Sequence, residues 1–349
     1  MTISHGYAAL TAKAELAPFT FNRREIGAHD VAFDIKYAGI CHSDIHQARE
    51  EWGPAIFPMV PGHEIAGVVT SVGSSVSKFK VGDRIGVGVF IDSCRECDNC
   101  TAGLEQYCRQ GMTGTYNTLE RDGSTVAMGG YSDTFVINED YAVHIPGNLD
   151  LAGVAPLLCA GITLYSPIKH WKVGPGKRVA VIGLGGLGHM GVKFAVAMGA
   201  EVTVLSHSPS KEADARAMGA HHFHSTKDET TFKKLYKSFD VILNTVSADI
   251  DLDSYVNLVD QDGTLVVIGL PGKPYSINAG TLLNGRRSVG GSMIGGIAET
   301  QEMLYFCAEH NIVSDVEVIP ATYINEAYQR TVASDVKYRF VIDASTFAS

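Results

Sequence analysis

Apolar and polar residues alternate in several short stretches of the first part of the chain. The run Asp30–Gly39 alternates throughout, and shorter strand-like runs cover Ile65–Val69, Asp83–Val89 and Ser132–Ile137, with glycine-rich turns between them. Alternation with a period of two residues is typical of strands that bury one face. The pattern predicts a compact, largely β, barrel-like domain in this part of the chain.

Near-continuous apolar runs replace this alternation in the middle of the chain. They cover Arg178–Ile182, Glu201–Ser206, Phe239–Val246 and Gly263–Gly269, and turns flank them. Such runs are typical of strands in a parallel sheet that is covered on both faces. They predict a doubly wound α/β domain. The tail Tyr338–Asp343 alternates again and is expected to rejoin the sheet of the first domain.

A glycine-rich turn follows the first of these apolar runs. It reads Gly183-Leu184-Gly185-Gly186-Leu187-Gly188 and leads into a helical pattern that extends to Met198. Glycines in this arrangement allow a tight turn and a close approach of the backbone to a pyrophosphate, to which the start of the helix offers N–H groups. Because a strand precedes the turn and a helix and a second strand follow it, the sequence predicts a dinucleotide-binding site.

The end of the second apolar run indicates which dinucleotide binds. An NAD site usually has Asp or Glu about 20 residues after the glycines, whereas this chain has Ser206, Ser208, Ser210 and Lys211 in that region. Hydroxyl groups and a cation suit a 2′-phosphate, and the missing carboxylate removes a charge that would repel it. An ordinary polar loop would explain the hydroxyls but not the missing acid, so NADP is the predicted cofactor.

Length and charge limit the classes of protein to consider. The chain has 349 residues, enough for two domains and a sizeable core. Its 28 Lys and Arg residues against 38 Asp and Glu residues give a net charge of −10, and no basic run could neutralise a phosphate backbone. Nucleic acid is therefore not expected as a partner. The first residues do not resemble a signal peptide, and no apolar stretch reaches the ~20 residues of a membrane span, so a cytosolic protein is expected.

Four of the seven cysteines lie in one short loop. Two residues separate Cys94 from Cys97 and Cys97 from Cys100, and seven separate Cys100 from Cys108. Four thiolates in one loop can close a tetrahedral zinc site without leaving a position for a substrate. The spacing differs from that of a bacterial ferredoxin, in which three residues precede a fourth cysteine that a proline follows. A structural zinc site is predicted.

A second concentration of reactive groups is the run Cys41-His42-Ser43-Asp44-Ile45-His46. Taken alone, it is compatible with a nucleophilic cysteine activated by histidine, with one ligand of a catalytic metal beside a proton relay, or with a buried cysteine among surface histidines. His63 and Cys159 supply two more candidate ligands. Together with Cys41 they would hold a zinc ion and leave its fourth position open.

These motifs together resemble those of the zinc-dependent medium-chain alcohol dehydrogenases. The matching segments are Gly39–Asp44, Pro61–Glu64, the four-cysteine loop, Pro156–Gly161 and the glycine-rich turn, so the similarity extends over nearly the whole chain. It is closest to the cinnamyl-alcohol dehydrogenase branch, and in particular to its bacterial NADP-dependent aldehyde reductases, which Gly291–Gly296 and Lys337–Asp343 also match. The resemblance implies a zinc-dependent oxidoreductase that reduces aromatic and aliphatic aldehydes.

The resemblance also implies a domain arrangement and an assembly. Residues 1–155 and 295–349 would form a GroES-like catalytic domain, with the structural zinc loop at 92–108, and residues 156–294 an inserted Rossmann domain. The active site would lie in the cleft between them. A homodimer would form by edge-to-edge extension of the Rossmann sheets, with Arg287–Met293 as the edge.

Several residues take roles from the resemblance. Glu64 matches a glutamate that approaches the zinc during ligand exchange, and Asp44 matches a residue that orients the His63 ring. Arg339 is the expected partner of Asp44 and is also counted among the cofactor-binding residues. As hydride reaches the carbonyl carbon, zinc would stabilise the charge on the oxygen, Ser43 would supply a proton, and His46 would replenish Ser43 through the cofactor ribose.

The substrate pocket is expected to be lined by apolar residues, which are Trp52, Met112, Met293 and Ile294. Gly114 takes the position at which plant members carry a bulky aromatic residue, which favours a roomier pocket and a broad range of aldehydes.

The sequence is compatible with two alternative functions. One is a polyol dehydrogenase of the same fold, which Cys159 and the complete zinc loop disfavour. The other is a zinc-thiolate redox sensor or nucleotide-binding scaffold without turnover.

Three further features have no assigned role in catalysis. His42 is expected to help shape the cofactor side of the cleft. His221, His222 and His224 resemble a metal cluster but have no carboxylate or thiol close to them in the sequence pattern, so ligation is not predicted. Cys307 falls on the amphipathic pattern that begins at Ala298 and is expected to be a core residue.

Overall fold

The computed structural model describes residues 2–347, which separate into two compact units. The first unit comprises Met1–Ile162 and Gly295–Ser349, and the second comprises Thr163–Ile294. The first division therefore falls inside the helix α4 (Ala160–His170), seven residues after the position expected from the sequence. This difference has a physical reason, because the start of α4 packs with the first unit: a side chain at Gly161 would contact Leu157 and Met303.

The first unit is built on β-structure. Its strands are β1 (Thr2–Ala8), β2 (Ala17–Arg23), β3 (Asp30–Gly39), β4 (Ile65–Val72), β5 (Arg84–Val87), β6 (Phe90–Asp92), β7 (Thr113–Gly114), β8 (Thr134–Asn138), β9 (Val143–His144), β16 (Val316–Ile319) and β17 (Arg339–Asp343). Its helices are α1 (His42–Ala48), α2 (Asp98–Thr101), α3 (Leu151–Val154), α10 (Ile297–His310) and α11 (Ile324–Val332), with 3-10 turns η1 (Glu105–Tyr107), η2 (Glu139–Tyr141), η3 (Ala155–Leu158), η5 (Ala321–Tyr323) and η6 (Ala344–Thr346).

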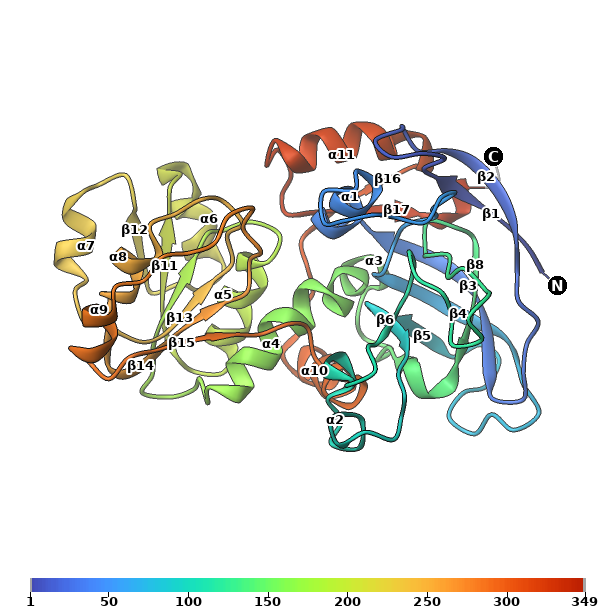
Figure 1. Ribbon diagram of the computed structural model, residues 1–349, viewed down its shortest axis with the longest axis horizontal. Helices are drawn as coiled ribbons and strands as arrows, with labels where there is room; N and C mark the ends of the chain where they lie inside the picture. The colour runs from blue at the N-terminus through green and yellow to red at the C-terminus, as the bar shows by residue number, and fades with distance from the viewer. Residues whose placement is uncertain (1, 348–349) are drawn as a thin grey trace. The chain divides into compact units, whose positions relative to one another are not determined.

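Seven strands of this unit form one mixed sheet in the order β16-β17-β3-β4-β5-β9, with β8 also pairing with β3. The predicted strand Asp30–Gly39 is confirmed as β3, which buries alternate residues along most of its length. The predicted return of the C-terminal tail is also confirmed, because β17 pairs antiparallel with β3 (Figure 1). A closed barrel would require the first and last strands of this sheet to pair with each other. Among the described residues, β16 and β9 lie at opposite ends of the strand order and do not pair, so the expected barrel-like shape is not confirmed by hydrogen bonding.

The second unit has the expected parallel sheet. Its strands are β10 (Arg178–Ile182), β11 (Glu201–Ser206), β12 (His222–Ser225), β13 (Phe239–Asn244), β14 (Val259–Val267) and β15 (Ser288–Gly291), and its helices are α5 (Gly188–Ala197), α6 (Glu212–Ala217), α7 (Thr230–Lys234), α8 (Leu252–Val256) and α9 (Ala279–Leu283), with the 3-10 turn η4 (Pro209–Lys211). The strand order is β12-β11-β10-β13-β14-β15 and every neighbouring pair is parallel.

This order runs third, second, first, fourth, fifth, sixth, which is the order of a Rossmann fold. The core beneath it is apolar: Ile182, Leu205, Ile242 and Leu265 are all buried in one cluster. The sheet therefore confirms the predicted doubly wound domain. The predicted strands at 178–182 and 201–206 have the bounds of β10 and β11, whereas β14 begins four residues earlier than the expected Gly263.

Within residues 2–347, no single helix is long and apolar enough to cross a membrane. One pair of consecutive helical segments, Leu151–Leu158 and Ala160–His170, reaches that length and composition only when joined across a bend of 57°.

Candidate active site

Three segments of the first unit bring the predicted catalytic ligands together. Cys41 follows the end of β3 and is the N-cap residue of α1, His63 precedes β4, and Cys159 lies between η3 and α4. The potential ligand atoms of these three residues and of Glu64 all lie within 4.8 Å of one another. Gly39 makes this packing possible, because a Cβ there would lie 2.1 Å from a Glu64 carboxylate oxygen.

The Asp44 carboxylate orients the His63 ring, as expected from the resemblance. His63 Nδ1 is 2.9 Å from Asp44 Oδ1, and both side chains are buried. Because this contact occupies Nδ1, it leaves Nε2 for another partner. Nε2 is buried and has no hydrogen-bond partner within the described part of the chain.

Arg339 does not have the predicted partner. The structure pairs its guanidinium with Glu64, at 2.6 and 2.7 Å from the two carboxylate oxygens, and with the carbonyl of Ile40 at 2.7 Å. The prediction that Arg339 pairs with Asp44 is therefore wrong. The reason is that Asp44 already accepts hydrogen bonds from its own helix start and from the His63 loop. The contact of Arg339 with a cofactor stays a prediction.

Burial and neighbouring charges shift the pKa values of the ionisable groups in this site. The hydrogen bond from Cys159 lowers the pKa of the Cys41 thiol well below its usual value, and the same contact raises the pKa of Cys159. Although burial acts against it, the Asp44 carboxylate holds the pKa of His63 well above its usual value. Burial raises the pKa of Glu64 to about 7, while Arg339 acts in the opposite direction. The buried group can therefore hold a thiolate beside a positive charge.

These residues fit a zinc ion. Two sulfurs and one imidazole are donors that zinc prefers, and three protein donors leave a fourth tetrahedral position. The buried Nε2 of His63 has no other partner among the described residues, which is the expected state of an atom that faces a metal. A metal that binds here would release the protons of the thiol and the imidazole, because both groups coordinate in their deprotonated forms.

The predicted relay residues lie on α1, next to the first ligand. The Ser43 hydroxyl is 3.6 Å from the Cys41 sulfur and is half-buried. His46 is also half-buried, and its Nδ1 lies 2.5 Å from a Glu51 carboxylate oxygen. The Trp52 ring stacks on the His46 ring at a centroid distance of 4.8 Å. His42 is exposed in part, and desolvation of the rest of its side chain lowers the pKa of the imidazole.

The four expected pocket residues differ in their exposure. Trp52 is 47% exposed and Met112 is half-buried, both in the first unit. Met293 is 44% exposed and Ile294 is buried, both in the second unit. Gly114, the position without a bulky aromatic, forms the short strand β7 with Thr113.

Sequence reasoning missed three buried tyrosines around Asp44. The Tyr131 hydroxyl donates to Asp44 Oδ2 at 3.0 Å, and the Tyr116 ring stacks on the His63 ring at a centroid distance of 5.9 Å. The Tyr328 ring packs edge-on against Tyr131. Burial raises the pKa of all three tyrosines well above the usual value. No local pattern marks them, because they come from three distant segments.

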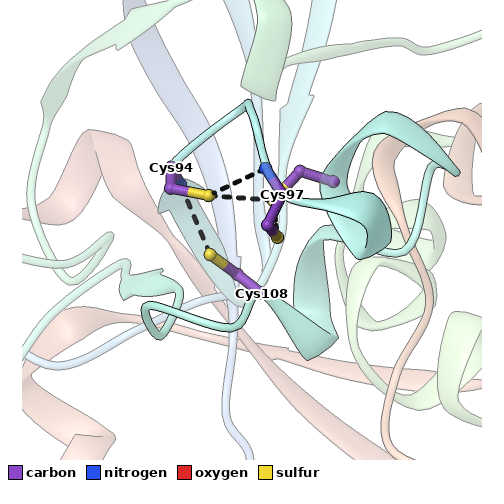
Figure 2. Close-up of side chains that lie close together, drawn as sticks. Cys94, Cys97 and Cys108 are labelled. Carbon is purple, nitrogen blue, oxygen red and sulfur yellow. Dashed lines mark hydrogen bonds between the residues drawn. The ribbon is translucent and has the colours of Figure 1, made fainter.

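The four cysteines of the 92–108 loop form a second group. Figure 2 shows Cys94, Cys97 and Cys108 turned toward one another, and the four sulfurs all lie within 4.8 Å. Cys100 Sγ lies 3.8 Å from Cys94 Sγ and 3.5 Å from Cys97 Sγ. Zinc–sulfur bonds of about 2.3 Å in a tetrahedron place the sulfurs about 3.8 Å apart. The loop therefore has the dimensions of a structural zinc site.

Backbone amides surround these sulfurs. The amide of Cys94 donates to Cys108 Sγ at 3.4 Å, that of Cys97 to Cys94 Sγ at 3.4 Å, and that of Arg109 to Cys97 Sγ at 3.5 Å. The hydrogen bond from the Arg109 amide is the main reason that the pKa of Cys97 is lowered to about 6. Such bonds stabilise negative charge on sulfur, as a metal–thiolate site requires.

The glycine-rich turn of the second unit has the geometry that a pyrophosphate needs. Gly183 adopts φ = 86°, and a Cβ at Gly188 would lie 2.1 Å from the Gly183 carbonyl oxygen. Gly185 faces open space, which a side chain would fill. Gly186 and Leu187 complete the turn, with Leu187 as the N-cap residue of α5. The turn thus leaves room for a phosphate at the start of the helix.

The predicted 2′-phosphate residues lie at the end of β11 and in η4. Ser206 is buried, and its hydroxyl accepts a hydrogen bond from the Ser208 amide at 3.2 Å. Lys211 Nζ donates to the carbonyl of Leu184, inside the glycine-rich turn, at 2.6 Å. Ser210 is exposed. The structure therefore brings the cation of this loop next to the turn.

The remaining candidates lie apart from these groups. His222 lies 2.9 Å from a Glu201 oxygen, so the expectation that no carboxylate is near the histidine cluster is wrong. His221 Nδ1 accepts from the Val202 amide, and the pKa of His224 is lowered, mainly by burial. Cys307 is fully buried, which confirms it as a core residue, and burial raises its pKa to about 12.

The fold and the two cysteine-containing groups define a two-domain zinc dehydrogenase. Residues 27–147 match the family described as alcohol dehydrogenase GroES-like domain, and residues 186–309 match the zinc-binding dehydrogenase family. The chain belongs to the zinc-dependent alcohol dehydrogenases. This confirms the resemblance inferred from the sequence.

Individual relatives resemble the chain over its whole length. It is 60% identical to the NADP-dependent alcohol dehydrogenase C 1 of Mycolicibacterium smegmatis, over 100% of both chains, and 51% identical to the aldehyde reductase YahK of Escherichia coli, over 97% of both. Among solved structures, a cinnamyl alcohol dehydrogenase from Sorghum bicolor is 43% identical and matches with a TM-score of 0.95, over 99% of this chain and 98% of that one. These matches favour the dehydrogenase hypothesis over a sensor or scaffold.

Proposed function

We propose that this protein transfers hydride between NADP(H) and a primary alcohol or aldehyde, and that it reduces aromatic and aliphatic aldehydes over a broad range. One observation carries the proposal: the ligand atoms of half-buried Cys41 and of buried His63 and Cys159 lie within 4.8 Å of one another, in a group that fits zinc. Three protein ligands leave a position for a substrate oxygen, whereas the four-cysteine loop is closed. NADP-dependent and aldehyde-reducing relatives support the choice of cofactor and substrate class.

When bound, zinc supplies stabilisation of negative charge on the substrate oxygen, and NADPH supplies the hydride. The chain's own residues hold these groups and manage the proton. Cys41, His63 and Cys159 hold the metal, and Asp44 fixes the orientation of His63. The buried Glu64–Arg339 pair keeps a carboxylate beside the ligands without leaving its charge uncompensated.

Ser43 is the proposed proton donor to the substrate oxygen. Its hydroxyl lies beside the first metal ligand, on a helix that limits its movement. His46 is three residues further along the helix and is the proposed source from which Ser43 regains its proton. Glu51 occupies His46 Nδ1, which leaves Nε2 to exchange the proton. Trp52, with Met112, Met293 and Ile294, is proposed to line the pocket, and Trp52 also supports the His46 ring.

In the second unit, the glycine-rich turn is proposed to hold the pyrophosphate, and Ser206, Ser208, Ser210 and Lys211 the 2′-phosphate. The hydroxyls and the ammonium group of this loop match a phosphate dianion.

We also propose that the protein is a cytosolic homodimer. The cysteines are all unpaired thiols, as expected in a reducing compartment. The strand β15 ends the Rossmann sheet, and a second copy could extend that edge.

The proposed activity is tested by following NADPH absorbance with a panel of about a dozen aldehydes that includes benzaldehyde and cinnamaldehyde. Steady consumption is expected, with a zinc content near two atoms per chain, and a chelator that removes one zinc is expected to stop it. A protein that contains zinc but consumes no NADPH with any aldehyde would contradict the proposal.

Lys211→Ala is expected to lower kcat/KM for NADPH by about 10- to 100-fold, the effect of losing one charge-assisted hydrogen bond to a phosphate. The value for NADH, which lacks the 2′-phosphate, should change little. Lys233→Ala, which removes an exposed lysine of the same unit, is the matched control. Wild-type preference for NADH, or equal losses with both cofactors in Lys211→Ala, would contradict the assignment.

A further inference from the structure

The buried carboxylate of Asp44 accepts four hydrogen bonds. Oδ1 accepts from His63 Nδ1 at 2.9 Å and from the Gly62 amide at 3.2 Å. Oδ2 accepts from the Cys41 amide at 2.9 Å and from the Tyr131 hydroxyl at 3.0 Å. Three of these donors belong to the segments that carry the metal ligands. Of these four donors, the Tyr131 hydroxyl is the one that comes from another part of the chain, 87 residues away.

The segment that carries Tyr131 is tied to the His63 loop along its backbone. The amides of residues 129, 130 and 131 donate to carbonyls of residues 60, 62 and 61 at 2.7, 2.9 and 2.9 Å. Gly62 adopts φ = 103°, and a Cβ at that position would lie 2.5 Å from a Tyr131 ring carbon. The Tyr131 ring and the His63 loop therefore fit together only with glycine at position 62.

Arg23 forms a second set of hydrogen bonds to the segment that carries Tyr131. Its buried guanidinium donates to the carbonyls of residues 128, 129 and 134 and to the Ser132 hydroxyl, at 2.5 to 3.0 Å. The guanidinium lies between the rings of Phe21 and Phe135, 4.7 and 4.5 Å from their centroids. Tyr131 is fully buried between these two sets of contacts. Its hydroxyl consequently has little freedom to leave Asp44.

We propose that Tyr131 is a positioning residue of the catalytic metal site. Its hydroxyl holds Asp44 Oδ2, which keeps Oδ1 directed at His63 Nδ1 and therefore keeps Nε2 directed at the metal. A phenylalanine would keep the ring and its packing but leave Oδ2 with a single donor, so that the carboxylate and the imidazole could turn. Partners of metal-bound histidine contribute about 10- to 100-fold to metal affinity. This inference rests on the proposed zinc site.

The test compares zinc release from wild type, Tyr131→Phe and Tyr328→Phe with a chromogenic chelator. Tyr131→Phe is expected to lose the catalytic zinc, the one whose loss parallels loss of activity, about 10- to 100-fold faster than wild type. Release of the structural zinc should be unchanged. Tyr328→Phe is the matched control, because Tyr328 is buried against Tyr131, while the hydrogen bond to Asp44 comes from the hydroxyl of Tyr131. It should release both zinc ions at the wild-type rate.

A second comparison separates positioning from general loosening. In an Asp44→Asn background, Tyr131→Phe is expected to have a much smaller effect, because the carboxylate that it holds is gone. Equal acceleration of both zinc ions, an additive effect in that background, or unchanged release from Tyr131→Phe would each overturn the role of Tyr131. The proposed function is tested separately, by the zinc content of the wild-type protein. A wild-type protein without a second zinc would refute the proposed function, whatever the variants do.

Discussion

Ser43→Ala is expected to lower kcat for aldehyde reduction by roughly 10²- to 10⁴-fold while both zinc ions stay bound, because a positioned proton donor contributes about that factor. The Ser43 hydroxyl lies 3.6 Å from the Cys41 sulfur but is not one of the grouped ligand atoms, so its loss should leave the metal site intact. Stopped-flow or steady-state kinetics, with zinc analysis of the same sample, measure both quantities.

Ser43→Thr is the matched control for this prediction. Threonine keeps a hydroxyl at the same position of α1 and should retain most of the turnover, which an effect of helix packing alone would not explain. Turnover of Ser43→Ala close to that of wild type would remove Ser43 from the proton path. Loss of zinc from Ser43→Ala would instead show that the hydroxyl supports the ligand Cys41.

Cys100→Ala is expected to reduce the zinc content from two atoms per chain to one and to unfold the 92–108 loop locally. The helical elements of this loop are short, being the four residues of α2 and the three of η1. In small structural sites, zinc binding contributes about 10–16 kcal/mol of apparent free energy, which is also folding free energy. Proteolysis within the loop should become at least tenfold faster, for which about 1.4 kcal/mol of lost local stability is sufficient.

Cys307→Ala is the matched control for the loop. Cys307 is a fully buried cysteine on α10 and belongs to neither group of ligands, so its variant should keep two zinc ions and a protected loop. A Cys100→Ala protein that still holds two zinc ions would contradict the structural assignment. A protein that loses one zinc but keeps the loop protected would show that other contacts hold the loop.

Several features of the fold and of the candidate site could be predicted from the sequence because they depend on local patterns. The strand β3 follows from alternation over Asp30–Gly39, and β10 with its glycine-rich turn follows from a short apolar run and the need for positive φ at Gly183. The four cysteines of the 92–108 loop could be assigned together because 15 residues of chain connect them, so that few conformations separate their sulfurs.

The residues around the catalytic ligands could not be assigned in the same way. Arg339 and Glu64 are separated by 275 residues and meet because β17 pairs with β3, and this register places the guanidinium against Glu64 rather than Asp44. Tyr131 reaches Asp44 because its segment lies along residues 60–62. Periodicity predicts that a strand forms, but it does not specify which strand lies beside it or in which register.

The sequence by itself thus determined the two kinds of domain, the glycine-rich turn, the four-cysteine loop and the set of candidate metal ligands, because each rests on residue type and short spacing or on a resemblance that extends over the chain. Only the tertiary structure decided which buried groups support those ligands: Arg339 on Glu64 and Tyr131 on Asp44. Burial makes these contacts obligatory, since a carboxylate without water needs donors, and the donors come from whichever segments the packing brings close.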